Sequence, residues 1–136
     1  MNNIEVIRNI AGFSAVIGCL LSFVSVFFLS IKLRKKKWHM MREIIEQTPE
    51  KFKERARFLM ESNMSWLIGS LVSYTWFGYP MMRYLWSINR SEIIQWQEGI
   101  KIIFSKDYLL YRLLALFFNI GILGFITFVI LGYVIK

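Results

Sequence analysis

Five basic side chains fall within the six positions from residue 32 to residue 37: Lys32, Arg34, Lys35, Lys36 and Lys37. Such a cluster attracts phosphate groups, and each Lys or Arg near an anionic lipid surface contributes about 1 kcal/mol of binding free energy. The cluster directly follows an apolar run and has no interleaved aromatic residues for base stacking, which argues against a nucleic-acid partner. We therefore expect it to contact anionic lipid head groups at the cytoplasmic leaflet and to set the orientation of the chain.

Residue types that serve catalysis or metal binding are sparse. The chain has one histidine, His39, and one cysteine, Cys19, so His and Cys cannot form a metal cluster within one chain. The sequence has no glycine-rich phosphate loop, no HExxH motif and no GxSxG motif. The carboxylates of residues 43–54 stand three or four positions apart among lysines and arginines, a spacing that makes ion pairs along a helix. We expect neither a cofactor nor enzymatic activity.

Three polar residues stand out at or inside apolar runs. Arg83 and Arg112 bracket the second connection, and we expect both to reach the outer interface. A shared outer-face site for an anionic group or a partner carboxylate is the alternative. Asn119 lies about 15 Å past Leu109 along the last run, and a carboxamide in lipid needs a hydrogen-bond partner. The candidate partners are hydroxyls of the other runs: Ser22, Ser25, Ser70, Ser73 and Thr75.

Three long runs must position these residues. Residues 9–31, 62–82 and 113–135 contain no charged side chain. A mainly apolar run of about 18 residues or more can cross the bilayer core as a helix. The sequence therefore predicts an all-α integral membrane protein in which residues 1–136 form a single membrane domain. Its three transmembrane helices are expected at about 10–31, 64–86 and 109–135.

The two connections between these runs differ in charge. Residues 32–57 contain ten basic and four acidic side chains, a net charge of +6, whereas residues 87–108 contain three of each. Loops rich in Lys and Arg stay in the cytoplasm. We therefore expect the first connection and the C-terminus in the cytoplasm, and the N-terminus and second connection outside. The expected location is a bacterial inner (plasma) membrane.

Both connections show helical periodicity. In residues 32–62, Trp38, Met41 and Ile45 recur at helical spacing, and Thr48–Pro49 suits the start of a further helix. This pattern predicts a cytoplasmic helical hairpin, with a solvated loop as the alternative. In residues 87–108, apolar side chains fall mostly on one helical face. We expect an amphipathic helix on the outer leaflet, with a re-entrant segment or a strand as the alternative.

Small residues mark the faces on which the helices should pack. Ser14, Gly18 and Ser22 form a stripe on the first helix, and Gly121 and Gly124 lie on the third. Such stripes allow the backbones of membrane helices to approach closely. We expect these residues and Asn119 to hold together either a bundle within the chain or a homo-oligomer.

These observations favour a small, non-enzymatic polytopic inner-membrane protein that binds another membrane component. That partner is another membrane protein or a second copy of the chain, and the role is that of an accessory or regulatory subunit, or of an immunity or exclusion protein. In architecture alone, the expected three helices are similar to small bacteriocin immunity proteins.

Two alternatives remain open. One is a membrane-permeabilising oligomer, such as a holin-like protein or a defence effector. The expected three-helix topology resembles one class of holins, although the connections are long for that class. The other is a small transporter or channel, which the scarcity of polar side chains in the runs disfavours.

Overall fold

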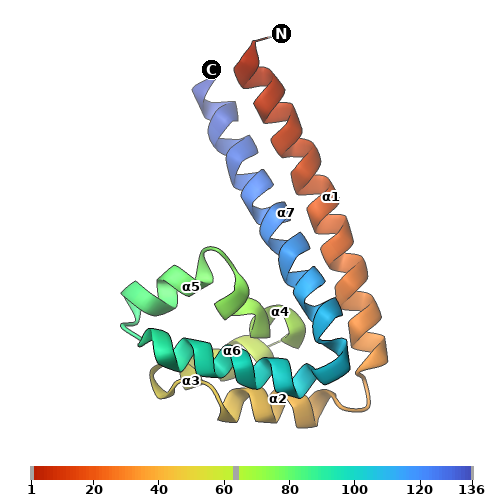
Figure 1. The fold of residues 1–136 in the computed structure, drawn as a ribbon. Helices are drawn as coiled ribbons and strands as arrows, with labels where there is room; N and C mark the ends of the chain where they lie inside the picture. The colour runs from red at the N-terminus through yellow and green to blue at the C-terminus, as the bar shows by residue number, and fades with distance from the viewer. Residues whose placement is uncertain (1, 63–64, 136) are drawn as a thin grey trace.

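The protein folds into a long two-helix hairpin that carries a helical head at one end (Figure 1). A computed structural model describes residues 2–62 and 65–135, and every regular element in these ranges is helical. The hairpin consists of α1 (Asn3–Lys32) and α7 (Tyr108–Val134), which lie side by side in opposite directions. Both termini therefore lie at the end of the hairpin away from the head.

The head is formed by residues 33–107, which connect the two long helices. Along the chain it contains α2 (Lys37–Glu46), α3 (Glu50–Glu61), α4 (Trp66–Ser70), the 3-10 turn η1 (Leu71–Tyr74), α5 (Gly78–Pro80), the π-helical turn η2 (Met81–Leu85), α6 (Arg90–Phe104) and the 3-10 turn η3 (Ser105–Asp107). In Figure 1, α4 lies beside the head-side end of α7, α5 lies at the side of the head away from the hairpin, and α2 lies along the lower edge of the head.

The hairpin helices are apolar on most sides. The structure contains two helical stretches long and apolar enough to cross a membrane, namely α1 and the stretch Arg90–Val134, whose apolar part is α7. Only 22% of the most apolar window of each is buried. A core helix of a soluble protein buries its apolar face, so this exposed apolar surface points to association with a membrane.

The head has its own apolar core, and α6 covers one side of this core. Ile93, Trp96 and Ile100 point from α6 into this core and are fully buried. The Trp96 indole Nε1 donates a hydrogen bond to the carbonyl oxygen of Ile44 in α2, at 3.1 Å. Phe52 of α3 packs against Trp96, with ring centroids 5.8 Å apart. The amphipathic helix expected here is present, but its apolar face lies on α2 and α3.

The helical hairpin expected in residues 32–62 is also present, as α2 and α3, although its turn differs in detail. Thr48 was expected to cap the second helix, but its hydroxyl donates to the carbonyl oxygen of Ile44 at 2.8 Å. Pro49 precedes the first residue of α3, where its fixed φ and missing N–H suit a helix start.

The prediction of a continuous transmembrane helix over residues 64–86 is wrong for the part that the structure describes, residues 65–86. This stretch is divided into α4, η1, α5 and η2. The Thr75 hydroxyl both donates to the carbonyl oxygen of Val72 at 3.0 Å and accepts from the N–H of Gly78 at 2.9 Å. Side-chain bonds of this kind compete with the helical ladder, and Pro80 lacks a backbone donor. The expectation of three spans is therefore not confirmed.

The two connections, which were expected on opposite sides of the membrane, lie together in the head. The bond from Trp96 to Ile44 joins the expected outer segment to the expected cytoplasmic hairpin. A bilayer about 30 Å thick cannot separate two groups that touch. The antiparallel hairpin also places the C-terminus beside the N-terminus, which does not fit an N-terminus outside and a C-terminus inside.

Candidate functional site

Two glycines allow the hairpin helices to meet backbone to backbone. A Cβ atom on Gly18 of α1 would lie 2.5 Å from the backbone nitrogen of Gly121 and 2.9 Å from the carbonyl oxygen of Phe117. A Cβ atom on Gly124 would lie 2.7 Å from the backbone nitrogen of Ala15. These separations are too short for any side chain, so the close approach of α1 and α7 requires glycine at both positions.

The two serines of the same stripe, Ser14 and Ser22, differ in burial. Ser22 is buried, and its hydroxyl donates to the carbonyl oxygen of Gly18 at 2.7 Å, within α1. Ser14 is half-buried. A serine hydroxyl that bonds the preceding turn needs no partner from another helix, so Ser22 is available only for packing.

Asn119 joins α7 to the broken segment of the head. Its Nδ2 donates to the carbonyl oxygen of Tyr74 at 2.9 Å, and its Oδ1 accepts from the N–H of Trp76 at 3.0 Å. The partners expected from the sequence were side-chain hydroxyls, but both observed partners are backbone groups. Because Tyr74 ends η1 and Trp76 lies between η1 and α5, these backbone groups lack the partners of a continuous helix. Asn119 replaces the bonds that a continuous helix would have made.

A polar network continues from this point into the head. The Tyr74 hydroxyl donates to the carbonyl oxygen of Gln97 at 2.9 Å and lies 3.1 Å from the hydroxyl of Tyr108. The Gln97 side chain donates to the carbonyl oxygen of Ser73 at 2.7 Å. Burial raises the pKa of the Tyr74 hydroxyl above its ordinary value, with a further contribution from its bond to Tyr108. These hydrogen bonds connect η1 to α6 and to the start of α7.

An ion pair closes the junction of the hairpin and the head. The Nζ atom of Lys32, in the last turn of α1, lies 2.5 Å from Oδ1 of Asp107, directly before α7. The Asp107 side chain is 8% exposed, whereas that of Lys32 is 42% exposed. Of the five clustered basic residues, Lys32 is therefore the one whose charge is held against a buried carboxylate.

The other four basic residues of the cluster lie in and beside the turn between α1 and α2. Arg34, Lys35 and Lys36 are exposed, and Lys37 is half-buried. The Lys37 ammonium lies 5.0 Å from the centroid of the Trp38 ring, which is itself exposed. Consecutive basic side chains next to an exposed indole have the composition of a membrane-interface anchor.

Arg83 and Arg112 do not lie on a face opposite the basic cluster. Arg83 is in η2, where its guanidinium donates to the carbonyl oxygen of Ile88 at 3.2 Å. Arg112 is exposed, one turn into α7. Both are at the head end of the hairpin. A shared site for an anionic group, given above as the alternative, stays a prediction.

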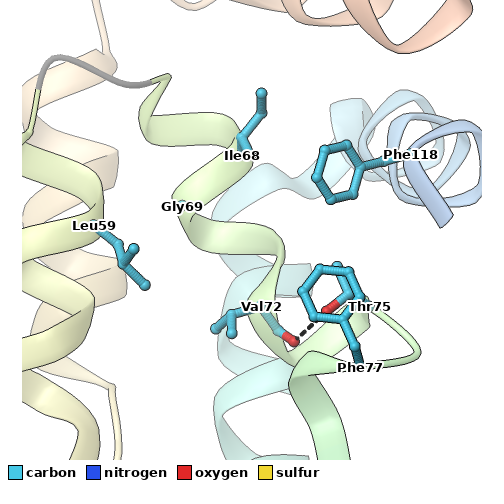
Figure 2. Close-up of a pocket in the computed structure, with 7 residues that line it drawn as sticks. All are labelled: Leu59, Ile68, Gly69, Val72, Thr75, Phe77 and Phe118. Atoms are coloured by element: carbon cyan, nitrogen blue, oxygen red, sulfur yellow. Dashed lines mark hydrogen bonds between the residues drawn. The ribbon is translucent and has the colours of Figure 1, made fainter. Parts of the chain in front are cut away.

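A hollow lies between the broken segment, α3 and α7 (Figure 2). It has a volume of about 160 Å³. Leu59 reaches it from α3, Ile68 from α4, and Phe118 from α7, as Figure 2 shows. The remaining lining residues are Gly69, Val72, Thr75 and Phe77. Because the Thr75 hydroxyl is bonded to Val72 and Gly78, the hollow presents an apolar wall.

Groups suited to metal binding are scattered. Across residues 2–62 and 65–135, no three His, Cys, Asp or Glu side chains are arranged to hold a metal ion. His39 Nε2 lies 3.1 Å from Glu43 Oε1 on the exposed side of α2. The Cys19 thiol is free and exposed on α1.

Several residues at the junction escaped prediction from the sequence. Asp107 was counted only as a charge of the second connection, and Gln97 and Tyr74 were not singled out. The signal for Asp107 was available: it lies just before the last expected transmembrane helix, residues 109–135, as Lys32 lies just after the first, residues 10–31. In an antiparallel hairpin, these positions meet. The comparisons with known proteins found no matching family model, no matching curated protein and no matching solved structure.

Proposed function

We propose that this protein is a non-enzymatic, membrane-anchored binding protein whose hairpin crosses a bacterial inner membrane and whose head recognises another membrane protein from the cytoplasm. An accessory or regulatory subunit and an immunity or exclusion protein are both of this kind. The observation that carries the proposal is that the fold has two distinct parts: an apolar hairpin in which residues 9–31 and 113–134 carry no charge, and a packed head that exposes aromatic and basic side chains.

Charge supports the orientation. Residues 32–107 contain 14 basic and 8 acidic side chains, a net charge of +6, and lie at one end of the hairpin. In residues 1–8, at the other end, the charged side chains are Glu5 and Arg8, whose charges cancel. The positive-inside rule places the head in the cytoplasm and therefore both termini outside. In this orientation, residues 34–37 face anionic head groups of the cytoplasmic leaflet.

The exposed side of α3 supports the proposed role in binding another membrane protein. Phe58 is 74% exposed although it stands in a charged helix. On one side of α3 is a hollow of about 340 Å³ whose lining includes Trp38 and Arg57, and on the other a hollow of about 520 Å³ whose lining includes Phe58 and Trp86. Aromatic and Arg side chains dominate the energetic centres of protein interfaces.

The buried polar groups of the head support a structural role over a catalytic one. Tyr74 and Trp96 donate their polar hydrogens to backbone carbonyls, as do the amides of Gln97 and Asn119. Groups committed to the backbone hold elements together and are not free to transfer protons to a substrate.

Cysteine accessibility tests the orientation. In a Cys19→Ala background, single cysteines replace Asn3, Glu50 or Ser91, and intact cells are treated with a membrane-impermeant maleimide. We expect Asn3→Cys to react in intact cells, and Glu50→Cys and Ser91→Cys only after lysis. Opposite behaviour of positions 50 and 91 would support three spans and overturn the proposed hairpin.

Site-specific photocrosslinking tests the binding role. A photoreactive amino acid replaces Phe58 in the full chain, expressed in its native host, with the exposed Ser91 as the control position. We expect one discrete adduct with a second membrane protein at position 58, none at position 91, and loss of the adduct when Trp38→Ala is added. Absence of any adduct at 58, together with prompt membrane depolarisation on expression, would favour a permeabilising oligomer instead.

A further inference from the structure

An apolar groove runs between the hairpin and the head. The hollow beside α4 adjoins a second hollow of about 320 Å³, and Ile68 and Phe118 line both. The second hollow extends along α1 and α7, where its lining also includes Cys19, Ser22, Phe23, Val26 and Ile122. The two hollows therefore form one groove, with α1 and α7 on one side and α4 and η1 on the other.

The groove lies deep along the hairpin. Counted at about 1.5 Å per residue, Phe118 is about 16 Å from Asp107 and Cys19 is about 20 Å from Lys32. The uncharged part of the hairpin ends at Lys32 in α1 and at Arg112 in α7, so Phe118 lies about 9 Å past the last charge of α7. Because the hydrocarbon core of a bilayer is about 30 Å thick, the groove and the α4–η1 segment of the head that borders it lie within the head-side leaflet when the hairpin crosses the membrane.

The walls of the groove suit hydrocarbon better than water. The hydroxyls of Ser22 and Thr75 are both bonded to backbone carbonyls of their own segments, so they offer little to a water molecule. Ser65 also lines the second hollow, and its buried hydroxyl has no hydrogen-bond partner among the described residues. The other side chains that line the second hollow are apolar. An apolar cavity of about 150 Å³ stays dry and takes up a molecule the size of benzene. By that measure, the two hollows together equal roughly three benzene-sized volumes and hold a hydrocarbon segment of about 18 carbon atoms.

We propose that this groove binds one acyl chain of a phospholipid from the head-side leaflet, between α7 and the α4–η1 segment. The proposal rests on the membrane crossing of the hairpin that is proposed above. A helix of a second copy is about 10–12 Å across with its side chains, whereas the inner hollow of about 160 Å³ admits only a single chain. The size of the groove thus selects an acyl chain over a helix.

Photolabelling from the lipid phase tests the proposal. The purified full-length protein is reconstituted in phosphatidylcholine vesicles that contain a phospholipid with a diazirine in its acyl chain, and adducts are mapped by peptide mass spectrometry. We expect strong labelling at Ile68 and Val72, which are half-buried and line the groove. Phe125 and Ile130, on the exposed surface of α7, report contact with bulk lipid.

Variants that fill or enlarge the groove sharpen the test. Ile68→Trp should lower labelling of the α4–η1 peptide at least fivefold, and Val72→Phe provides a second, smaller filling. The matched control Ile130→Trp should leave that labelling unchanged, and Phe118→Ala should increase it.

The outcomes separate this proposal from the one on which it rests. Labelling at Phe125 and Ile130 without labelling at Ile68 and Val72 would overturn the acyl-chain site and leave the membrane hairpin standing. Absence of labelling at all four positions would overturn both. Crosslinks from the groove to a second copy of the chain would show that a protein helix covers it, and would also overturn the site.

Discussion

Asn119 donates a hydrogen bond to the carbonyl oxygen of Tyr74, which precedes it by 45 residues, at 2.9 Å. The same carboxamide accepts from the N–H of Trp76. One side chain in the middle of an apolar helix thereby satisfies both a donor and an acceptor where the head segment leaves its helical path. Backbone groups without partners are costly in an apolar environment, so this bond makes the broken segment compatible with its position beside α7.

Replacement of Asn119 should destabilise the junction. Asn119→Leu leaves the carbonyl of Tyr74 and the N–H of Trp76 without their partner, so we expect a loss of about 1–3 kcal/mol in the free energy of unfolding. Asn119→Asp keeps an acceptor for Trp76 and should lose less. The measurement is chemical unfolding in detergent, followed by circular dichroism. Ile120→Leu, at the next, exposed position, is the control, and a loss no larger than in that control would contradict the assigned role.

We expect Gly18, where α1 and α7 cross, not to tolerate a side chain, and we expect Gly132, near the end of α7, to tolerate one. Gly18→Ala places a Cβ 2.5 Å from the backbone of Gly121, so α1 and α7 must separate. We expect a loss of about 1–3 kcal/mol, as for overpacked cores. In the control Gly132→Ala, the added Cβ meets no atom within 4 Å. That variant should be neutral or slightly more stable, since alanine favours helix. Equal behaviour of the two variants would mean that the helices do not cross at Gly18.

Gly78→Ala distinguishes a broken segment from a transmembrane helix. In the structure, a Cβ on Gly78 would overlap the carbonyl oxygen of Val72, so the turn after η1 must distort. We expect this variant to unfold at a lower denaturant concentration than the wild type. In a continuous helix, the same change would be neutral or stabilising. A gain in stability would therefore restore the three-span interpretation.

The pair Lys32–Asp107 should matter more than the other basic residues of the cluster. Lys32→Met leaves a buried carboxylate without its cation. We expect a loss of about 1–3 kcal/mol, less than the roughly 3–5 kcal/mol of a fully buried pair because Lys32 is partly exposed. Lys35→Met is the matched control and should leave the free energy of unfolding nearly unchanged. Addition of Asp107→Asn to Lys32→Met should restore part of the loss, and failure of that rescue would show that Lys32 acts by packing alone.

Much of the local structure is readable from the sequence because it depends on neighbours along the chain. Uncharged runs over residues 9–31 and 113–135 correspond to α1 and α7, and the apolar spacing in residues 38–60 corresponds to α2 and α3. The apolar face of α6 is likewise visible in the spacing of Ile93, Trp96 and Ile100. Helix formation and amphipathic character are set by residues three or four positions apart, and those distances are present in the sequence.

Tertiary structure alone decided whether residues 65–86 form a helix and on which side the two connections lie. Residues 62–82 lack charged side chains, as the other two runs do, but residues 65–86 contain more polar side chains, among them Ser65, Ser70, Ser73, Thr75 and Arg83. The breaks at Thr75 and Gly78 are tolerated because Asn119 supplies hydrogen bonds from more than 40 residues away. The position of α6 on α2 depends in the same way on the contact of Trp96 with Ile44. Hydrophobicity measures how well a segment tolerates lipid, but the path of its backbone depends on which distant groups satisfy its donors and acceptors.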